Sequence, residues 1–126
     1  MGVQMIGIDH SLAEIEVREK FSFTKSQAAA LMKKWMAYQG IYGIVLLSTC
    51  NRMEIYVNSE GGIYDYCKLL CVEKGVDEAE YRPFFRLRDG KEAVRHLFET
   101  TAGLRSLIVG EDQILTQVRE ALSRAR

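Results

Sequence analysis

Residues 44–57 read IVLLSTCNRMEIYV and place a short polar segment between two apolar runs. The runs Ile44–Leu47 and Ile55–Val57 are short and rich in β-branched and aromatic side chains, which predicts two β-strands. Cys50 therefore lies where one strand ends and the next begins, and Asn51, which tolerates turn geometry, follows it directly. A rigid sheet holds a thiol in such a place while its sulfur stays open to a cleft.

Charged and hydrogen-bonding residues surround this cysteine in the sequence. Arg52 and Glu54 are two positions apart, so they share one face of the second strand. A thiol close to a guanidinium group and to the side chains of Thr49 and Asn51 is typical of a nucleophile that acts on a substrate carrying a carboxylate. The alternative is a small buried cysteine without chemistry, which is the common role at strand ends. The polar neighbours favour the nucleophile.

A second polar pattern lies in residues 103–118, which read GLRSLIVGEDQILTQV. The apolar residues recur at helical spacing and predict an amphipathic helix. Glu111 falls within the apolar face, where a carboxylate needs a partner or a ligand. Ser106, Gln113 and Gln117 form a separate stripe around Gly110, and neutral donors and acceptors beside a glycine suit a small polar ligand. The alternative is a solvated face interrupted by a helix break.

The two motifs S-T-C-N-R-x-E and G-L-x-S-x-x-x-G-E-x-Q-I-x-x-Q-V together strongly resemble glutamyl-tRNA reductase. The resemblance extends over essentially the whole chain, in the right order and at the right spacing. The sequence departs from the family at Asp9, where Asn is usual, and at Ala13-Glu14, where Ala-Pro is usual. These departures concern the first loop and not the cysteine motif.

The resemblance implies a specific reaction and a set of site residues. In that family a cysteine attacks the ester that joins glutamate to its tRNA, and NADPH then reduces the glutamyl thioester to glutamate-1-semialdehyde for tetrapyrrole biosynthesis. By match to the motifs, the catalytic residues are Cys50 and His96. The residues expected to bind the substrate are Thr49, Asn51, Arg52, Ser106, Glu111, Asp112, Gln113 and Gln117. Arg52 is expected to pair with a substrate carboxylate, and Glu111 with the α-ammonium group.

The role of His96 depends on the resemblance. Residues 91–99 predict a helix with His96 on its flank and with a buried face made of Ala93, Val94, Leu97, Phe98 and Thr101. The flank position by itself indicates a partly exposed structural histidine. The family places a functional histidine here, where it would hydrogen-bond the substrate carbonyl or favour the thiolate. No general base stands next to Cys50 in the sequence. His10 ends the first predicted strand and either lines the same cleft or has a structural role.

Composition bounds the class of protein. A length of 126 residues with 48% hydrophobic and 27% charged residues is typical of one globular domain. Three cysteines without secretory features indicate a reducing compartment, and we expect a cytoplasmic protein. Cys67 and Cys71 have no partners at zinc-ligand spacing, so they are expected to pack in the core and no metal site is predicted. No signal peptide or membrane-spanning run is visible.

The expected fold is α+β, with the order β-α-β-β-α-β of a ferredoxin-like antiparallel sheet and additional helices. We expect the helices to cover one face of the sheet and the cysteine turn to lie at its rim. Predicted strands cover residues 3–9, 44–47, 55–57 and 84–88. Predicted helices cover residues 12–19, 24–38, 64–74, a segment from 91, and 106–117. The second helix opens with the capping box Thr24-x-x-Gln27.

No G-x-G-x-x-G sequence follows any predicted strand, so no dinucleotide-binding unit is expected here. We expect residues 1–126 to be the catalytic, substrate-binding domain, with the NADPH-binding and dimerisation domains outside this chain, and to be unable to complete the reduction alone. Because the formal net charge is zero, we expect much of the tRNA contact to lie outside this chain. The alternative is a local basic patch, at Lys33-Lys34 or at Arg82, Arg86 and Arg88. The resemblance also implies a homodimeric full-length protein and an association with glutamate-1-semialdehyde aminomutase. The alternative function is an amino-acid-binding regulatory domain or a thiol sensor without catalysis.

Overall fold

The computed structural model describes residues 2–9, 11–49, 51–60 and 64–103. The elements in chain order are β1 (Gly2–Asp9), α1 (Ile15–Lys20), α2 (Lys25–Met36), β2 (Ile41–Ser48), β3 (Arg52–Ser59), α3 (Tyr66–Lys74), α4 (Glu78–Tyr81), the 3-10 helix η1 (Arg82–Phe84), β4 (Arg86–Asp89) and α5 (Gly90–Gly103). Within the described ranges, no helix is both long enough and apolar enough to cross a membrane.

The four strands form one antiparallel sheet in the order β2-β3-β1-β4. The class is therefore α+β, as predicted, and β2 and β3 flank the cysteine turn as expected. Both strands extend further than their apolar runs. In the β1–β3 pair, Gly7 lies opposite Glu54 and Asp9 lies opposite Arg52. This register brings the polar end of the first strand beside the motif that follows Cys50.

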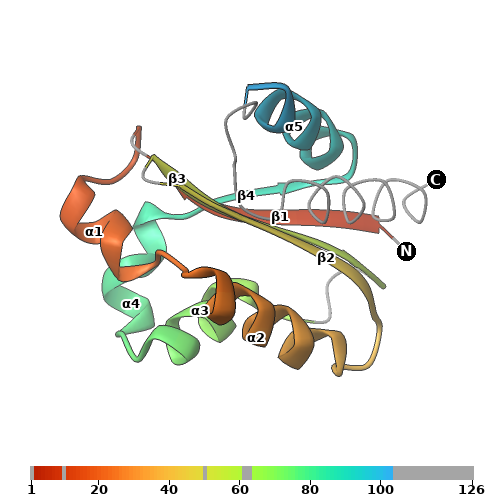
Figure 1. The fold of residues 1–126 in the computed structure, drawn as a ribbon, viewed down its shortest axis with the longest axis horizontal. Coiled ribbons are helices and arrows are strands. Elements are labelled where there is room, and N and C mark those ends of the chain that lie inside the picture. The colour runs from red at the N-terminus through yellow and green to blue at the C-terminus, as the bar shows by residue number, and fades with distance from the viewer. Residues whose placement is uncertain (1, 10, 50, 61–63, 104–126) are drawn as a thin grey trace.

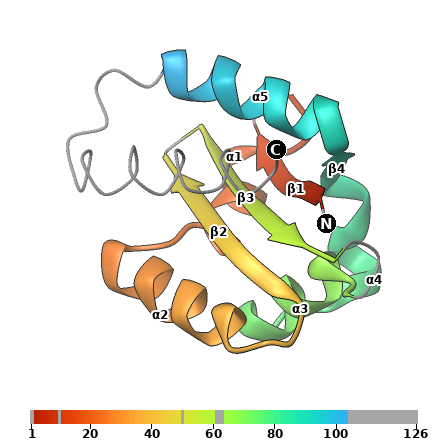
Figure 2. The same cartoon turned by 90° about the vertical axis from the view of Figure 1, so that its right-hand side faces the viewer.

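Helices cover both faces of the sheet, so the prediction that they cover one face was wrong. Figures 1 and 2 show α5 on one face and α2 and α3 on the other. Strand β3 explains this arrangement, because its side chains alternate between two buried layers. Ile55 and its neighbours pack in the larger core with α2 and α3, whereas Tyr56 packs in a second core with Ala93 and Leu97 of α5.

Local sequence signals fix the helix ends. The Thr24 hydroxyl accepts a hydrogen bond from the Gln27 N–H at 3.2 Å, and the Gln27 side chain accepts one from the Thr24 N–H at 3.0 Å. This confirms the predicted capping box at the start of α2. Helix α3 begins after the N-cap Asp65 and ends at Gly75, whose φ of 67° is the left-handed conformation that favours glycine.

The segment before β4 differs from the prediction. Residues 78–84 form α4 and η1, and the strand begins at Arg86 instead of Phe84. Pro83 lies in the first turn of the 3-10 helix, where its fixed φ is tolerated and its missing N–H costs no hydrogen bond. Tyr81 is buried and packs edge-to-face on Phe21, with ring centroids 5.5 Å apart. That long-range packing holds the turn in place.

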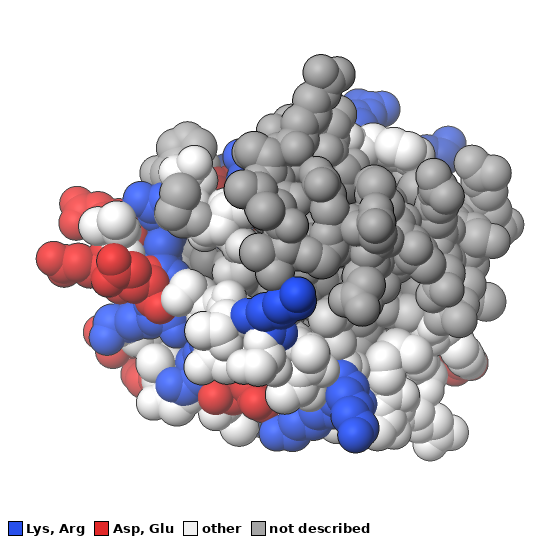
Figure 3. Space-filling model, viewed as in Figure 1, with Lys and Arg blue, Asp and Glu red and all other residues white. Residues whose placement is uncertain are grey.

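The charged side chains are of mixed sign. The chain has 17 basic and 17 acidic residues. In Figure 3, Asp and Glu side chains gather at the edge of the molecule where α1 lies, with Lys and Arg side chains close beside them. Over the described residues on the side drawn in Figure 3, acidic and basic side chains are thus mixed, and this side does not present one broad basic patch to a polynucleotide.

Candidate active site

The turn between β2 and β3 is closed by its own backbone and by Thr49. The Thr49 N–H donates to the Arg52 carbonyl at 2.8 Å. The Thr49 hydroxyl accepts hydrogen bonds from the N–H groups of Asn51 at 3.2 Å and Arg52 at 3.3 Å. Thr49, predicted to bind substrate, thus already holds the turn around position 50. The Asn51 side chain is exposed at the turn.

The side chain of Glu54 is a carboxylate buried in the sheet, with 2% of its surface exposed. Its Oε1 accepts a hydrogen bond from the Tyr56 hydroxyl at 3.1 Å, and its Oε2 contacts Nε2 of His96. The Arg52 guanidinium lies 3.9 Å from Oε2. A buried carboxylate is tolerated only where such partners compensate for its lost hydration. Glu54 is therefore the centre of a small polar cluster.

His96 is held from two sides. Its Nε2 meets the Glu54 carboxylate, and its ring stacks on Tyr56 with the centroids 6.5 Å apart and 28° between the planes. Helix α5 presents it beside Ala93 and Leu97, which are buried against the sheet. The contact at Nε2 fixes the orientation of the ring and leaves Nδ1 as the nitrogen for other partners. The predicted position on the helix flank is confirmed.

Asp9 adds a second carboxylate at the same end of the sheet, opposite Arg52. The pKa of Asp9 lies below its usual range. Partial burial by itself would raise this pKa, but hydrogen bonds from the Ser11 hydroxyl and N–H and the guanidinium groups of Arg86 and Arg52 outweigh that effect. Asp9 is thus an anion that balances the cationic side chains around the turn.

The structure brings together one predicted catalytic residue, His96, and one predicted substrate-binding residue, Arg52, through Glu54. Thr49 and Asn51 lie at the turn beside Arg52. The remaining predicted site residues lie outside the described residues, as does His10: Cys50, Ser106, Glu111, Asp112, Gln113 and Gln117. In the ranges that are described, no group of three or more His, Cys, Asp or Glu side chains has an arrangement that would hold a metal ion.

The family of the chain follows from its sequence. Residues 6–126 match the model of the family described as "Glutamyl-tRNAGlu reductase, N-terminal domain". The chain belongs to this family. The match spans the cysteine turn, the Glu54 cluster and the helix that carries His96.

Named relatives agree with this assignment. A glutamyl-tRNA reductase of Acetivibrio thermocellus is 47% identical over 127 residues, which cover 100% of this chain and 38% of that protein. A glutamyl-tRNA reductase of Alkaliphilus oremlandii is 42% identical over 130 residues, covering 100% of this chain and 38% of that protein. The chain thus spans less than two fifths of the length of these relatives.

A solved structure is similar to this one. The glutamyl-tRNA reductase from Methanopyrus kandleri matches with a TM-score of 0.57 and 35% sequence identity, over 98% of this chain and 28% of that chain.

Glu54 was not predicted as a site residue. Glu54 belongs to the S-T-C-N-R-x-E motif. A charged residue between Met53 and Ile55 in an otherwise apolar strand indicates a functional role, and this could have been recognised from the sequence. Its partner His96 is 42 positions away in the chain, so only the tertiary fold reveals the pair. The family match and the geometry together make Glu54 a candidate functional residue.

Cys67 and Cys71 are buried on α3, as predicted. Burial raises the pKa of Cys67 to about 12, and the neighbouring Cys71 thiol adds to this effect. Burial likewise raises the pKa of Cys71. At pH 8 a thiol with a pKa near 12 has a thiolate fraction roughly 10³-fold below that of an ordinary cysteine.

We therefore expect Cys67 and Cys71 to resist iodoacetamide at pH 8 in the folded chain and to react readily in urea. Peptide mass spectrometry after timed alkylation measures both rates. Labelling of Cys67 in the folded chain as fast as in urea would contradict the buried environment of α3.

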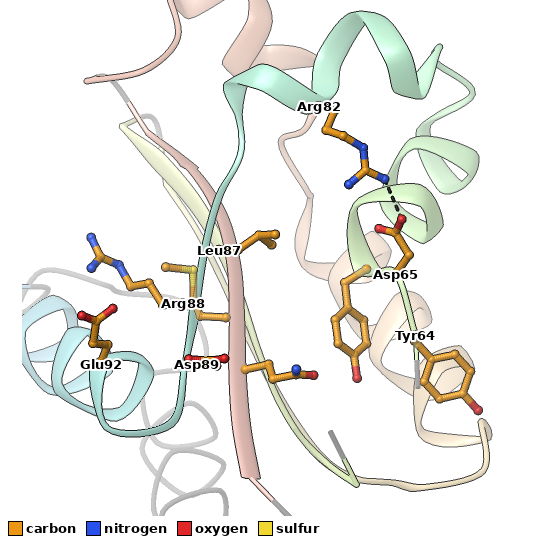
Figure 4. A pocket seen from close by; sticks show the side chains of 10 residues that line it. Tyr64, Asp65, Arg82, Leu87, Arg88, Asp89 and Glu92 are labelled. Carbon is orange, nitrogen blue, oxygen red and sulfur yellow. Dashed lines mark hydrogen bonds and ion pairs between the residues drawn. The ribbon is translucent and has the colours of Figure 1, made fainter. Parts of the chain in front are cut away.

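A cavity of about 390 Å³ lies between β4 and the start of α3. Figure 4 shows the Arg82 guanidinium directed at Asp65, while Arg88 and Glu92 lie on the opposite side of β4. Arg82 donates to Asp65 at 2.6 Å and to Glu78 at 2.9 Å. The lining carries three carboxylates, Asp65, Asp89 and Glu92, against the guanidinium groups of Arg82 and Arg88, so the cavity has no net positive charge to offer an anionic substrate.

Proposed function

We propose that residues 1–126 are the catalytic, substrate-binding domain of a glutamyl-tRNA reductase. In this proposal the domain transfers the glutamyl group from tRNA to Cys50. The observation that most supports it is the buried Glu54 carboxylate, which contacts His96 and lies beside Arg52 on the strand that follows Cys50. A paired histidine and an arginine next to a cysteine turn suit acyl transfer from a carboxylate-bearing substrate.

In the proposed step, the Cys50 thiolate attacks the ester carbonyl carbon. A sulfur–carbon bond forms, the bond from that carbon to the ribose oxygen breaks, and the ribose oxygen takes up a proton as the tRNA leaves. His96 either supplies this proton or donates a hydrogen bond to the carbonyl oxygen, with its ring oriented by Glu54. An aminoacyl ester is already activated toward nucleophiles, so the thiolate can attack it without help from an additional general base.

Arg52 is proposed to bind the substrate carboxylate. Its side chain is 26% exposed and 3.9 Å from Glu54, so the guanidinium is anchored on one side and accessible on the other. A guanidinium group pairs with a carboxylate through two parallel hydrogen bonds, which orient the substrate. Asn51 lies exposed on the same turn. Ser106, Glu111, Asp112, Gln113 and Gln117 are proposed to complete the pocket, on the basis of the family motif.

The described residues do not fit a nicotinamide dinucleotide. Every strand pair is antiparallel, and no G-x-G-x-x-G sequence follows a strand, whereas dinucleotide sites use such a turn at the end of a parallel strand. We propose that NADPH, which supplies hydride in this family, is bound by residues outside this chain. No part of the reduction is assigned to these side chains.

The finer description of the fold is also a proposal. The strand order and the antiparallel pairing support a ferredoxin-like sheet, to which α1, α4, η1 and α5 are additions. The homodimer, the association with glutamate-1-semialdehyde aminomutase and the cytoplasmic location remain predictions from the family resemblance.

The decisive experiment is mass spectrometry of the intact chain and of its digested peptides after mixing with glutamyl-tRNA. We expect a glutamyl adduct on the Cys50 peptide and release of uncharged tRNA, and neither product with Cys50→Ser. Adding NADPH to the pure chain should give no semialdehyde. Unmodified Cys50 with saturable binding of free glutamate would contradict the acyl-transfer function and favour an amino-acid sensor.

A further inference from the structure

Lys74, the last residue of α3, turns its ammonium group back toward the protein. Its Nζ donates to the Ser22 carbonyl oxygen at 2.5 Å and lies 3.9 Å from the centre of the Phe23 ring. Burial lowers the pKa of Lys74, against an opposite effect of the neighbouring Glu73 carboxylate, so the ammonium group has given up part of its hydration. The carbonyl oxygen and the aromatic face compensate for the lost water.

Ser22 and Phe23 belong to the linker between α1 and α2, and this linker holds the end of β2. The Phe23 N–H donates to the Ser48 hydroxyl oxygen at 3.1 Å. Ser48 is the last residue of β2 and comes two positions before Cys50. The Phe23 ring packs against the larger core, so this donor is fixed by the core on one side and by Lys74 on the other. A series of contacts thus leads from the end of α3 to the cysteine turn.

The cysteine turn is therefore anchored at both of its ends. On the β3 side, the Arg52 carbonyl accepts the Thr49 N–H at 2.8 Å. On the β2 side, the Ser48 hydroxyl is held by the linker. Because Cys50 lies between these anchors in the chain, its place relative to a bound substrate depends on both. Reacting atoms need to lie about 3–3.5 Å apart, and a misplacement of about 1 Å can cost roughly 10²-fold in rate.

We propose that Lys74 is a positioning residue for acyl transfer, which acts through the linker and Ser48 on the turn that carries Cys50. This inference rests on the proposed function. The ammonium group acts on the linker and not on the substrate, and it keeps the linker against the end of β2. Its contact with Ser22 joins residues 52 positions apart in the chain. From the sequence alone, a lysine at the end of a helix is explained by the helix dipole, so only the tertiary fold reveals this role.

The test is single-turnover acylation of Cys50 with saturating glutamyl-tRNA, followed by mass spectrometry. Lys74→Met removes the charge and the hydrogen bond to Ser22 but keeps an unbranched side chain. We expect it to lower the rate constant at saturation about 10-fold and to leave the half-saturating concentration of glutamyl-tRNA within about 2-fold of the native value. Ser48→Ala should have the same effect, because it removes the acceptor of the Phe23 N–H.

A rescue variant and a control variant separate positioning from folding. Lys74→Arg keeps a cation that can donate to the Ser22 carbonyl and stack on the Phe23 ring, so it should retain the rate within about 2-fold. Lys68→Met makes the same chemical change at an exposed position of α3 and should leave the rate unchanged. At saturation every folded molecule reacts with the same rate constant, so a partly unfolded preparation lowers the amount of adduct and not the rate constant.

The double variant Lys74→Met/Ser48→Ala should be no slower than the slower single variant, since both changes act through the same linker. A native rate in Lys74→Met, an equal loss in Lys68→Met, or losses that multiply in the double variant would overturn the positioning role and leave acyl transfer standing. Failure of the native chain to form any adduct with glutamyl-tRNA would instead overturn the proposed function, and this inference with it.

Discussion

Replacing Glu54 by Gln is expected to lower the rate of Cys50 acylation by roughly 10²-fold or more while the chain stays folded. The amide has the shape of the carboxylate but no charge, and it can present an N–H group to His96 where the native residue only accepts. The His96 imidazole then loses the carboxylate contact at Nε2 that fixes the orientation of the ring. Arg52 also loses its anchor, since its guanidinium lies 3.9 Å from the same oxygen.

Single-turnover acylation with saturating glutamyl-tRNA measures this effect, because it separates the chemical step from substrate binding. The matched control is Glu60→Gln, which removes an exposed carboxylate just beyond the far end of β3. Saturating substrate removes the contribution of Arg52 to binding, so the carboxylate then acts through the histidine. The double variant Glu54→Gln/His96→Ala should therefore be no slower than His96→Ala alone. Additive losses in the double variant, or a native rate in Glu54→Gln, would exclude the positioning role.

Local patterns predicted the elements that local interactions determine. The apolar runs around Cys50 identified β2 and β3, and the Thr24–Gln27 box identified the start of α2, because strand alternation and helix capping depend on residues close in the chain. The family motif supplied Arg52 and His96 as site residues. Their spatial relation was not predicted, since it depends on where α5 crosses the sheet.

The errors have a common physical origin in tertiary packing. Phe98 was predicted on the buried face of α5, yet it is 52% exposed. Of the α5 side chains whose burial is described, up to residue 99, only those of Ala93 and Leu97 are fully buried. A helix on a sheet buries a narrow stripe, and Phe98 lies about 100° from Leu97 around the helix. Likewise, the sequence of β3 predicts a single strand with two charged residues, Arg52 and Glu54. Its burial on both faces follows from α5 folding back over the sheet, which no local pattern encodes.

Gly7→Ala is expected to destabilise the chain by about 1–3 kcal/mol and to weaken the Glu54–His96 contact. A Cβ at Gly7 would lie 3.0 Å from Cγ of Glu54 and 3.1 Å from the carbonyl oxygen of Met53. The Met5 sulfur, also at 3.1 Å, belongs to a flexible side chain that can shift. The Met53 carbonyl is part of the sheet and cannot, and Glu54 is held by its partners. The strain therefore falls on the polar cluster.

Thermal unfolding followed by circular dichroism measures this cost, which corresponds to a fall in Tm of about 3–15 °C. Gly2→Ala is the matched control on the same strand, because a Cβ there meets nothing within 4 Å, and it should be neutral or slightly stabilising. In a Glu54→Ala background, which removes the atom closest to the new methyl group, Gly7→Ala should cost about 1 kcal/mol less than in the native chain. Equal losses of stability on Gly7→Ala in the two backgrounds would show that the glycine is required only by the backbone packing of β1. A smaller cost in the Glu54→Ala background would mean that position 7 requires glycine because the Glu54 side chain packs directly against it. The first strand and the residue that orients His96 would then depend on each other.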